Sequence, residues 1–216
     1  MIIDERMTTY INSLDTENSS FLESLEREAK ADQVPIIRRE MQSFLKVMLM
    51  LKQPTRILEI GTAVGFSALL MCENAPANCH ITTIENYQKR IPIAQANFAK
   101  ADVAERITLL NGDANEILKE LKGSFDFIFM DAAKAQYINF LPEILRLMDK
   151  GAVLISDNVL QDGDIIESHF AIERRNRTIH KRMREYLYQI KHHDELITSI
   201  IPLGDGVTVS IKREME

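Results

Sequence analysis

The stretch from Arg56 to Ser67 constrains the fold more than any other part of this chain. It begins with a mostly apolar run at 57–60, which has the length of a β-strand, and it breaks at Gly61. After Gly65 the apolar residues recur at the spacing of a helix. Glycine lets the chain turn tightly after a strand, and the N–H groups that open the following helix can bind a polar group. This order predicts a ligand-binding loop in an α/β sheet.

Glu59 is an acid at the end of the otherwise apolar strand. The pattern Glu59-x-Gly61-x-x-x-Gly65 departs from the three glycines of a dinucleotide-binding loop. A carboxylate at this point repels a pyrophosphate and attracts a cationic ligand. S-adenosylmethionine carries a sulfonium and an ammonium group and no phosphate, and the stretch resembles the first motif of class I methyltransferases. A purely structural strand–turn–helix unit is the alternative.

From Arg56 onward, predicted strands and helices alternate, which is typical of a parallel sheet with helices on both faces. Gly204-Asp205-Gly206 predicts a closing hairpin and therefore an antiparallel last strand. The pattern predicts an α/β fold, the Rossmann-like seven-stranded sheet of class I methyltransferases, in one domain over 1–216. The predicted strands are 56–60, 80–85, 106–110, 125–130, 152–156, 195–201 and 206–213. The helices between them are 65–74, 87–100, 114–121, 134–147 and 164–191.

The N-terminal helices, residues 1–52, precede the Rossmann-like core, residues 56–213. Two amphipathic helices within 1–30 carry an excess of acidic residues, and a third spans about 38–52. The first two helices could act as a lid, serve as a dimer arm or simply pack on the sheet, and the sequence does not distinguish these alternatives. Met41 belongs to a Met-rich stripe that is usually core but can also border a ligand.

Composition is that of an ordinary globular protein, with 45% apolar and 27% charged residues and a formal net charge of −6. No signal peptide and no run of about 20 apolar residues is present, so we expect no membrane partner. Cys72 and Cys79 lack the spacing of metal ligands, and we expect free thiols and a cytoplasmic protein.

Acids at the predicted strand ends are informative because ligands of such sheets bind beyond the carboxyl ends of the strands. Glu85 ends the second strand, where it can accept hydrogen bonds from the two hydroxyls of a ribose. Asp113 follows the third strand and can bind an adenine amino group, with the N–H of Ala114 on a ring nitrogen. Asp113 also fits the N-cap of the next helix, and it can serve both purposes.

Oxygen ligands follow the fourth and fifth strands. Asp131 ends one, and Asp157 and Asn158 end the next, so all three are expected at the same edge of the sheet. Carboxylate and amide oxygens without His or Cys favour Mg²⁺. Such a cation helps an oxygen nucleophile to ionise and aligns it with the methyl donor. Lys134, three residues after Asp131, is placed to accept the proton, the alternative being an exposed lysine at a helix start.

These motifs together resemble the metal-dependent catechol and caffeoyl-CoA O-methyltransferase family over roughly residues 35–213. The matching segments are Glu59-x-Gly61, Gly65-Phe-Ser67, Glu85, Asp131-Ala-Ala-Lys134 and Asp157-Asn158-Val159. The resemblance implies S-adenosylmethionine, Mg²⁺ and a homodimer. It also implies that Asp131, Asp157 and Asn158 bind the metal, that Lys134 with Asp131 is catalytic, and that Ser67, Glu85, Asp113, Ala114 and Asp131 contact the cofactor.

The family's chemistry requires two adjacent oxygens, as in a catechol or in the 5-hydroxyl and 4-carbonyl of 5-hydroxyuracil. The chain has no Trp to clamp a catechol ring, and its segment 172–193 holds seven Lys and Arg against two Glu. Such a patch suits a phosphate backbone, and Tyr186 or Tyr188 could stack on a base. The candidates for RNA contact are Arg174, Arg175, Arg177, Lys181 and Arg182. A solvated helix face that complements the acidic arm of a dimer partner is the alternative.

The whole chain is most similar to the bacterial tRNA 5-hydroxyuridine methyltransferases, which implies the anticodon loop of tRNA as partner and 5-methoxyuridine at the wobble position as product. An O-methyltransferase of a small catechol is the second hypothesis. A non-catalytic S-adenosylmethionine- or RNA-binding module is the third, and the complete ligand set with Lys134 argues against it.

Overall fold

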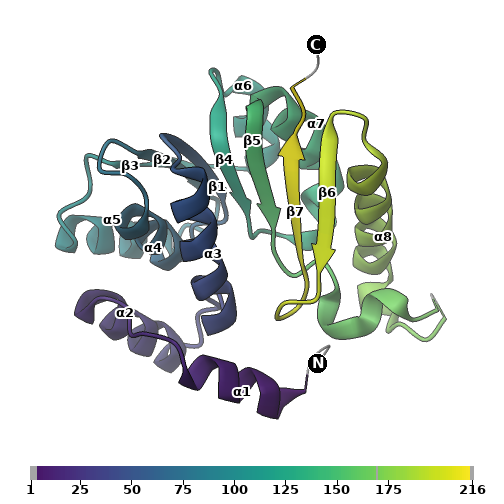
Figure 1. The fold of residues 1–216 in the computed structure, drawn as a ribbon, viewed down its shortest axis with the longest axis horizontal. Helices are drawn as coiled ribbons and strands as arrows, with labels where there is room; N and C mark the ends of the chain where they lie inside the picture. Colours follow the sequence, from purple (N-terminus) through teal and green to yellow (C-terminus); the bar gives the residue numbers. More distant parts are fainter. Residues whose placement is uncertain (1–3, 169, 215–216) are drawn as a thin grey trace.

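The computed structural model describes residues 4–168 and 170–214, which form a seven-stranded sheet in the order β3-β2-β1-β4-β5-β7-β6 (Figure 1). The first five strands are parallel, and β7 runs antiparallel to both β5 and β6. The predicted sheet and its closing hairpin are therefore confirmed. The strands are β1 (Arg56–Ile60), β2 (His80–Glu85), β3 (Ile107–Asn111), β4 (Phe125–Met130), β5 (Met148–Ser156), β6 (Leu196–Ile201) and β7 (Val207–Lys212).

Helices cover both faces of the sheet, because alternate strand residues are apolar on each side. Phe127 and Phe129 of β4 join the core under one helix layer, and Ile128 and Met130 join the core under the other. The first layer consists of α2 (Ser20–Ala31), α3 (Arg39–Lys52), α4 (Phe66–Asn74) and α5 (Ile91–Lys100). The second consists of α6 (Ala114–Glu120), α7 (Tyr137–Leu147) and α8 (Arg177–His192).

The strand register brings the ends of the central strands level. Ile60 of β1 pairs with Met130 of β4, and Met130 pairs with Ser156 of β5. The residues that follow these strands are therefore neighbours at one edge of the sheet. The order of the strands reverses beside β1, where β2 lies on one side and β4 on the other, and ligands of open α/β sheets bind at such a point.

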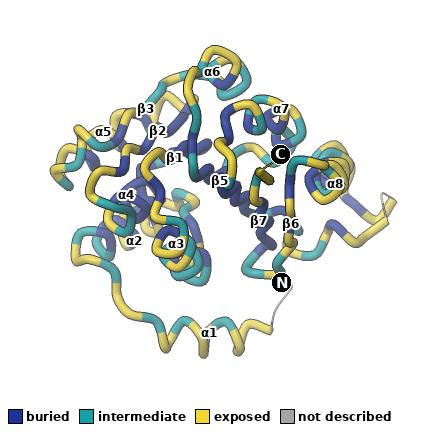
Figure 2. The backbone as a smooth tube through the Cα atoms, turned by 45° about the horizontal axis from the view of Figure 1, so that its top comes forward, coloured by how far each residue is buried: buried dark blue, intermediate teal, exposed yellow. Residues whose placement is uncertain are grey.

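The first helix, α1 (Glu5–Ser13), lies outside the two layers and contains no buried residue (Figure 2). It contacts α3, and the side-chain amide of Asn12 donates to Glu40. Within the described ranges, no helix is long and apolar enough to cross a bilayer.

The predicted helix over 164–191 is wrong in its first half. Asp162 and Gly163 have positive φ angles, and two short 3₁₀ turns, Gln161–Ile166 and Arg174–Asn176, precede α8, which begins only at Arg177. Ile165 and Ile172 are buried at a spacing that also suits a helix, which explains the error. A smaller difference is that β5 begins at Met148 rather than at 152, with an irregular pairing to β4 near its start.

Candidate active site

A cavity of about 350 Å³, called here the glycine-loop cavity, lies at the carboxyl ends of β1, β2, β3 and β4. Its lining includes most of the residues that the sequence predicts for cofactor binding. These are Gly61, Ser67, Glu85, Asp113, Ala114 and Asp131. The fold thus brings together residues from four separate strand ends.

Gly61 is required by the packing of the chain itself. Its φ angle is +105°, and a Cβ at this position would lie 1.9 Å from the backbone oxygen of Asp131. The amide of Asp131 in turn donates to Ile60 O at 3.0 Å. Only glycine therefore allows the turn after β1 to lie against the end of β4, which places Asp131 beside the cavity.

Glu85 is held rigidly at the end of β2. One carboxylate oxygen accepts the amide of Ala63 at 2.7 Å, and the other accepts the amides of Asn86 and Tyr87 at 3.0 and 2.8 Å. Asp113 caps α6 by accepting the amide of Asn115 at 2.8 Å, as its alternative role predicted, and it also lines the cavity. Both acids are thus oriented by the backbone before any ligand enters.

Glu59 and Met41 are also predicted to contact the cofactor, but neither lines the glycine-loop cavity. Glu59 is completely buried and does not line the glycine-loop cavity, where a direct contact was expected. Its carboxylate accepts the hydroxyl of Thr83, which pairs with the hydroxyl of Thr62 in the loop. Burial raises the pKa of Glu59 to about 7, while the hydroxyls of Ser67 and Thr83 oppose the shift. Glu59 therefore supports the glycine loop through the threonine hydroxyls. Met41 lines a separate cavity, which is described next.

The second cavity, of about 340 Å³, is called here the acidic cavity. It collects the predicted metal ligands and the predicted base at one place, since its lining includes Asp131, Asp157, Asn158 and Lys134. Asp131 lines both cavities, so the two meet at a single carboxylate.

Both aspartates of the acidic cavity have raised pKa values. Burial raises the pKa of Asp157 to about 7, and the negative charge of Asp131 adds to that shift. Burial also raises the pKa of Asp131 to about 6, against the opposing effect of the Lys134 ammonium. Two carboxylates that line one cavity and are removed from water lack enough positive charge nearby to stay fully ionised. A bound cation supplies that charge.

Asn158 is oriented by residues that the sequence did not single out as ligands. Its side-chain amide donates to Asp205 at 3.4 Å, and Asp205 forms an ion pair of 2.8 Å with Arg38. Burial raises the pKa of Asp205 to about 6, with Asp162 adding to the shift. The Gly204-Asp205-Gly206 turn was predicted, but that its acid reaches the end of β5 follows only from the antiparallel pairing of β7.

The donor set fits a hard divalent cation in its chemistry. Over the described ranges, no cluster of three or more His, Cys, Asp or Glu has the geometry of a metal site. The candidate set consists instead of two carboxylates and one amide, all oxygen donors, which leaves positions for water and substrate around Mg²⁺. The raised pKa values of Asp131 and Asp157 agree with a site that a cation completes.

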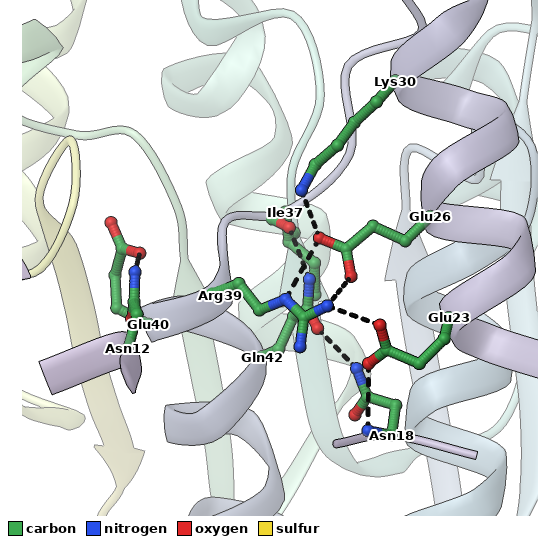
Figure 3. A network of polar contacts seen from close by, with 9 residues as sticks. All are labelled: Asn12, Asn18, Glu23, Glu26, Lys30, Ile37, Arg39, Glu40 and Gln42. Carbon is green, nitrogen blue, oxygen red and sulfur yellow. Dashed lines mark hydrogen bonds and ion pairs between the residues drawn. The ribbon is translucent and has the colours of Figure 1, made fainter. Parts of the chain in front are cut away.

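A common roof over both cavities is formed by residues 35–37. The carbonyl of Ile37 accepts the side-chain amide of Gln42 at 3.1 Å, within a network that reaches α2 (Figure 3). In the same network Arg39 forms ion pairs with Glu23 at 2.6 Å and with Glu26 at 2.8 Å. The acidic residues of α2 thus fasten the start of α3, next to residues 35–37.

The basic segment divides into exposed and bonded side chains. Arg174, Arg175 and Lys181 are exposed, and Arg175 forms an ion pair of 2.7 Å with Glu173. The other two predicted RNA contacts bind backbone carbonyls: Arg177 donates to Ile172 O at 3.1 Å, and Arg182 donates to Ala135 O at 3.2 Å. Part of the positive charge therefore holds the non-helical segment and the turn that carries Lys134.

The prediction that Tyr186 could stack on a base is wrong, because Tyr186 is fully buried and its hydroxyl pairs with that of Ser156 at 2.6 Å. Tyr188 is exposed and stacks on His192, with ring centroids 4.2 Å apart. It remains the candidate for stacking.

Comparison with known proteins assigns the chain to a family. The family model described as O-methyltransferase matches residues 12–213. The chain belongs to this O-methyltransferase family. It is 31% identical over 176 residues to caffeoyl-CoA O-methyltransferase 1 of Eucalyptus globulus, covering 77% of this chain and 70% of that protein.

A catechol O-methyltransferase of Niastella koreensis is 34% identical over 130 residues, which is 58% of this chain. The chain spans 59% of the length of that relative. Among solved structures, an SAH-bound methyltransferase of Podospora anserina has a TM-score of 0.88 at 25% identity and covers 97% of this chain and 95% of its own. The predicted O-methyltransferase family and methyltransferase fold are thereby confirmed, while the metal dependence and the tRNA substrate stay predictions.

Proposed function

We propose that this O-methyltransferase moves the methyl group of S-adenosylmethionine, bound in the glycine-loop cavity, to a hydroxyl oxygen in the acidic cavity. The observation that carries the proposal is that Asp131 lines both cavities. A donor in one cavity and an acceptor in the other would meet at this residue. The SAH-bound relative supports the choice of donor.

The residues of the glycine-loop cavity fit that donor. Glu85 would accept the ribose hydroxyls, and Asp113 and Ala114 would meet the adenine ring. Three backbone amides already fix the carboxylate of Glu85, so binding would require little reorganisation.

Asp131, Asp157 and Asn158 would hold Mg²⁺ in the acidic cavity. Such a cation supplies positive charge that makes a neighbouring hydroxyl easier to ionise. The amine of Lys134 would accept the proton that the hydroxyl loses as its oxygen takes the methyl group and S-adenosylhomocysteine leaves. The roof at residues 35–37 would keep water away from the sulfonium.

For the acceptor, we propose 5-hydroxyuridine at the wobble position of tRNA, whose adjacent 5-hydroxyl and 4-carbonyl suit the acidic cavity. The exposed Arg174, Arg175 and Lys181 support this choice, because they leave positive charge available for phosphates. Arg182 ties the same segment to the turn that follows Asp131. A tRNA substrate implies a cytoplasmic enzyme.

A small catechol is the second candidate, favoured by the relatives named as catechol and caffeoyl-CoA O-methyltransferases. A catechol presents the same pair of adjacent oxygens and would not need the basic segment.

The deciding experiment supplies labelled S-adenosylmethionine and Mg²⁺ together with two competing acceptors. These are hydroxyuridine-containing tRNA from a strain deficient in its methylation and a simple catechol. Label in the tRNA that disappears on adding EDTA is the expected result. Label in the catechol alone would contradict the tRNA substrate and keep the methyltransferase site, and labelling that EDTA leaves intact would contradict the metal.

A further inference from the structure

The separation of Asp131 and Asp157 depends on how the ends of β4 and β5 are joined. The amide of Asp157 donates to Met130 O at 3.0 Å, which is the last backbone link between the two strands at this edge. Beyond it the chains diverge into loops. The negative charge of Asp131 opposes ionisation of Asp157, so the two carboxylates repel each other. A further uncharged link between the ends of β4 and β5 would hold them at a fixed distance.

The hydroxyl of Tyr137, the first residue of α7, is that link. It lies 3.1 Å from Met130 O and 3.1 Å from Asp157 O, so its single proton is shared between the ends of two strands. It also accepts the amide of Ala132 at 3.3 Å. One hydroxyl therefore binds the backbone of β4, the backbone that follows β5, and the residue directly after Asp131.

The ring of Tyr137 is held in place by the packing around it. The side chain is fully buried and packs edge-to-face on Tyr186, with centroids 5.6 Å apart and an interplanar angle of 78°. A buried aromatic ring in this arrangement has little freedom to move its hydroxyl away. The hydroxyl cannot reach the acidic cavity as a ligand, because its contacts are all with backbone atoms.

We propose that Tyr137 is a positioning residue, which sets the distance between the Asp131 and Asp157 carboxylates and thereby the affinity of the acidic cavity for a divalent cation. This inference rests on the proposed cation site. It assigns the site's geometry to a residue that contacts neither substrate nor cation.

The test compares Tyr137→Phe with Tyr186→Phe, which is a matched control. Each substitution removes one buried tyrosine hydroxyl, but that of Tyr186 pairs with the side chain of Ser156 and not with a strand-end carbonyl. Binding of Mn²⁺ to each protein, with S-adenosylhomocysteine present, is followed by electron paramagnetic resonance. Thermal melts and calorimetry of S-adenosylhomocysteine binding are measured alongside.

Tyr137→Phe is expected to weaken Mn²⁺ binding about tenfold or more, the usual effect of losing a group that orients metal ligands. The Mg²⁺ concentration for half-maximal rate should rise by a similar factor, while the affinity for S-adenosylhomocysteine falls much less, because most of the glycine-loop cavity lies away from Tyr137. Tyr186→Phe should lower the melting temperature and leave Mn²⁺ binding unchanged. Equal Mn²⁺ affinity in both variants would overturn the inference.

A measurement on the unmodified protein keeps the inference testable if Tyr137→Phe does not fold. The Ala132 amide should exchange with deuterium as slowly as the amides of Asp131 and Asp157, which donate to carbonyls within the sheet. Exchange as fast as in an exposed loop would show that the link does not form and would overturn the inference. If Asp157→Asn binds Mn²⁺ as well as the unmodified protein does, the proposed cation site itself is wrong. This result separates failure of the cation site from failure of the Tyr137 inference alone.

Discussion

At the scale of single residues, the two aspartates of the acidic cavity destabilise the metal-free fold. Asp131 and Asp157 have pKa values raised to about 6 and about 7, above the ordinary 3.8. The folded protein therefore holds protons that the unfolded chain releases between about pH 4 and pH 7. Metal-free stability should fall as pH rises through this window, because the unfolded state binds fewer protons there.

Asp157→Asn should reduce this dependence and leave the metal-free protein more stable at pH 8, while the raised pKa values of Asp131, Glu59 and Asp205 keep the rest of it. Each 1 kcal/mol of relieved repulsion should raise the melting temperature by roughly 2–4 °C. The same variant should lose methyl transfer while S-adenosylmethionine still binds, since Asp157 does not line the glycine-loop cavity. Melting curves with EDTA from pH 5 to pH 8, together with calorimetry, check both effects. Loss of cofactor binding along with activity would contradict the assignment of Asp157 to the metal.

The sequence could predict Asp131, Asp157 and Asn158 because acids at the ends of parallel strands meet whatever the details of the loops. It could not predict Arg38 or Tyr137 as part of the site. The ion pair of Arg38 with Asp205 joins residues far apart in the chain, and Tyr137 acts through backbone atoms of two strands. Such contacts depend on register and helix placement, which the spacing of residue types does not encode.

At the scale of elements, the segment between β5 and α8 shows where periodicity misleads. Its buried isoleucines have a helical spacing, but Glu167 and Glu173 have extended ψ angles of 156° and 136°, which a helix does not allow. Arg184 donates to the carbonyls of Ile165 and Glu167 at 3.3 and 3.5 Å, which satisfies backbone groups that a helix would have paired internally. Some basic side chains of α8 thus stabilise the fold, in addition to any contact that the segment makes with RNA.

Replacing the exposed cations Arg174, Arg175 and Lys181 by Ser should weaken tRNA binding, because all three are exposed and carry positive charge, although Arg175 also forms an ion pair of 2.7 Å with Glu173. The slope of log affinity against log salt should flatten by about 0.7 for each lost phosphate contact. Replacing three exposed lysines elsewhere, Lys100, Lys122 and Lys150, removes the same charge and should have a smaller effect. Filter binding over a salt series measures both slopes. An equal loss in the two triple variants would mean that net charge, and not this surface, governs binding.

At the scale of the whole molecule, α1 stands out because none of its residues is buried by the part of the chain that the structure describes (Figure 2). Tyr10 and Ile11 are 61% and 53% exposed, and the neighbouring Met7 and Leu14 are also exposed. Apolar residues gathered on one exposed helix are typical of a contact with another protein. The expected homodimer would supply that cover from a second copy. Because α1 contacts α3, whose Gln42 donates to the carbonyl of Ile37 in the roof, assembly would also steady both cavities.

Tyr10→Ser combined with Ile11→Ser should therefore convert a dimer into a monomer, because the change removes apolar area at the interface and leaves the buried core intact. Light scattering should give the mass of two chains for the unmodified protein and of one chain for the variant. Ile93→Ser, an equally polar change at a 47% exposed position on α5, is the control and should remain dimeric. A monomeric variant should also bind S-adenosylmethionine more weakly, since the roof loses the support of α1. Two-chain mass in the variant would place the interface elsewhere, and one-chain mass in the unmodified protein would contradict the dimer itself.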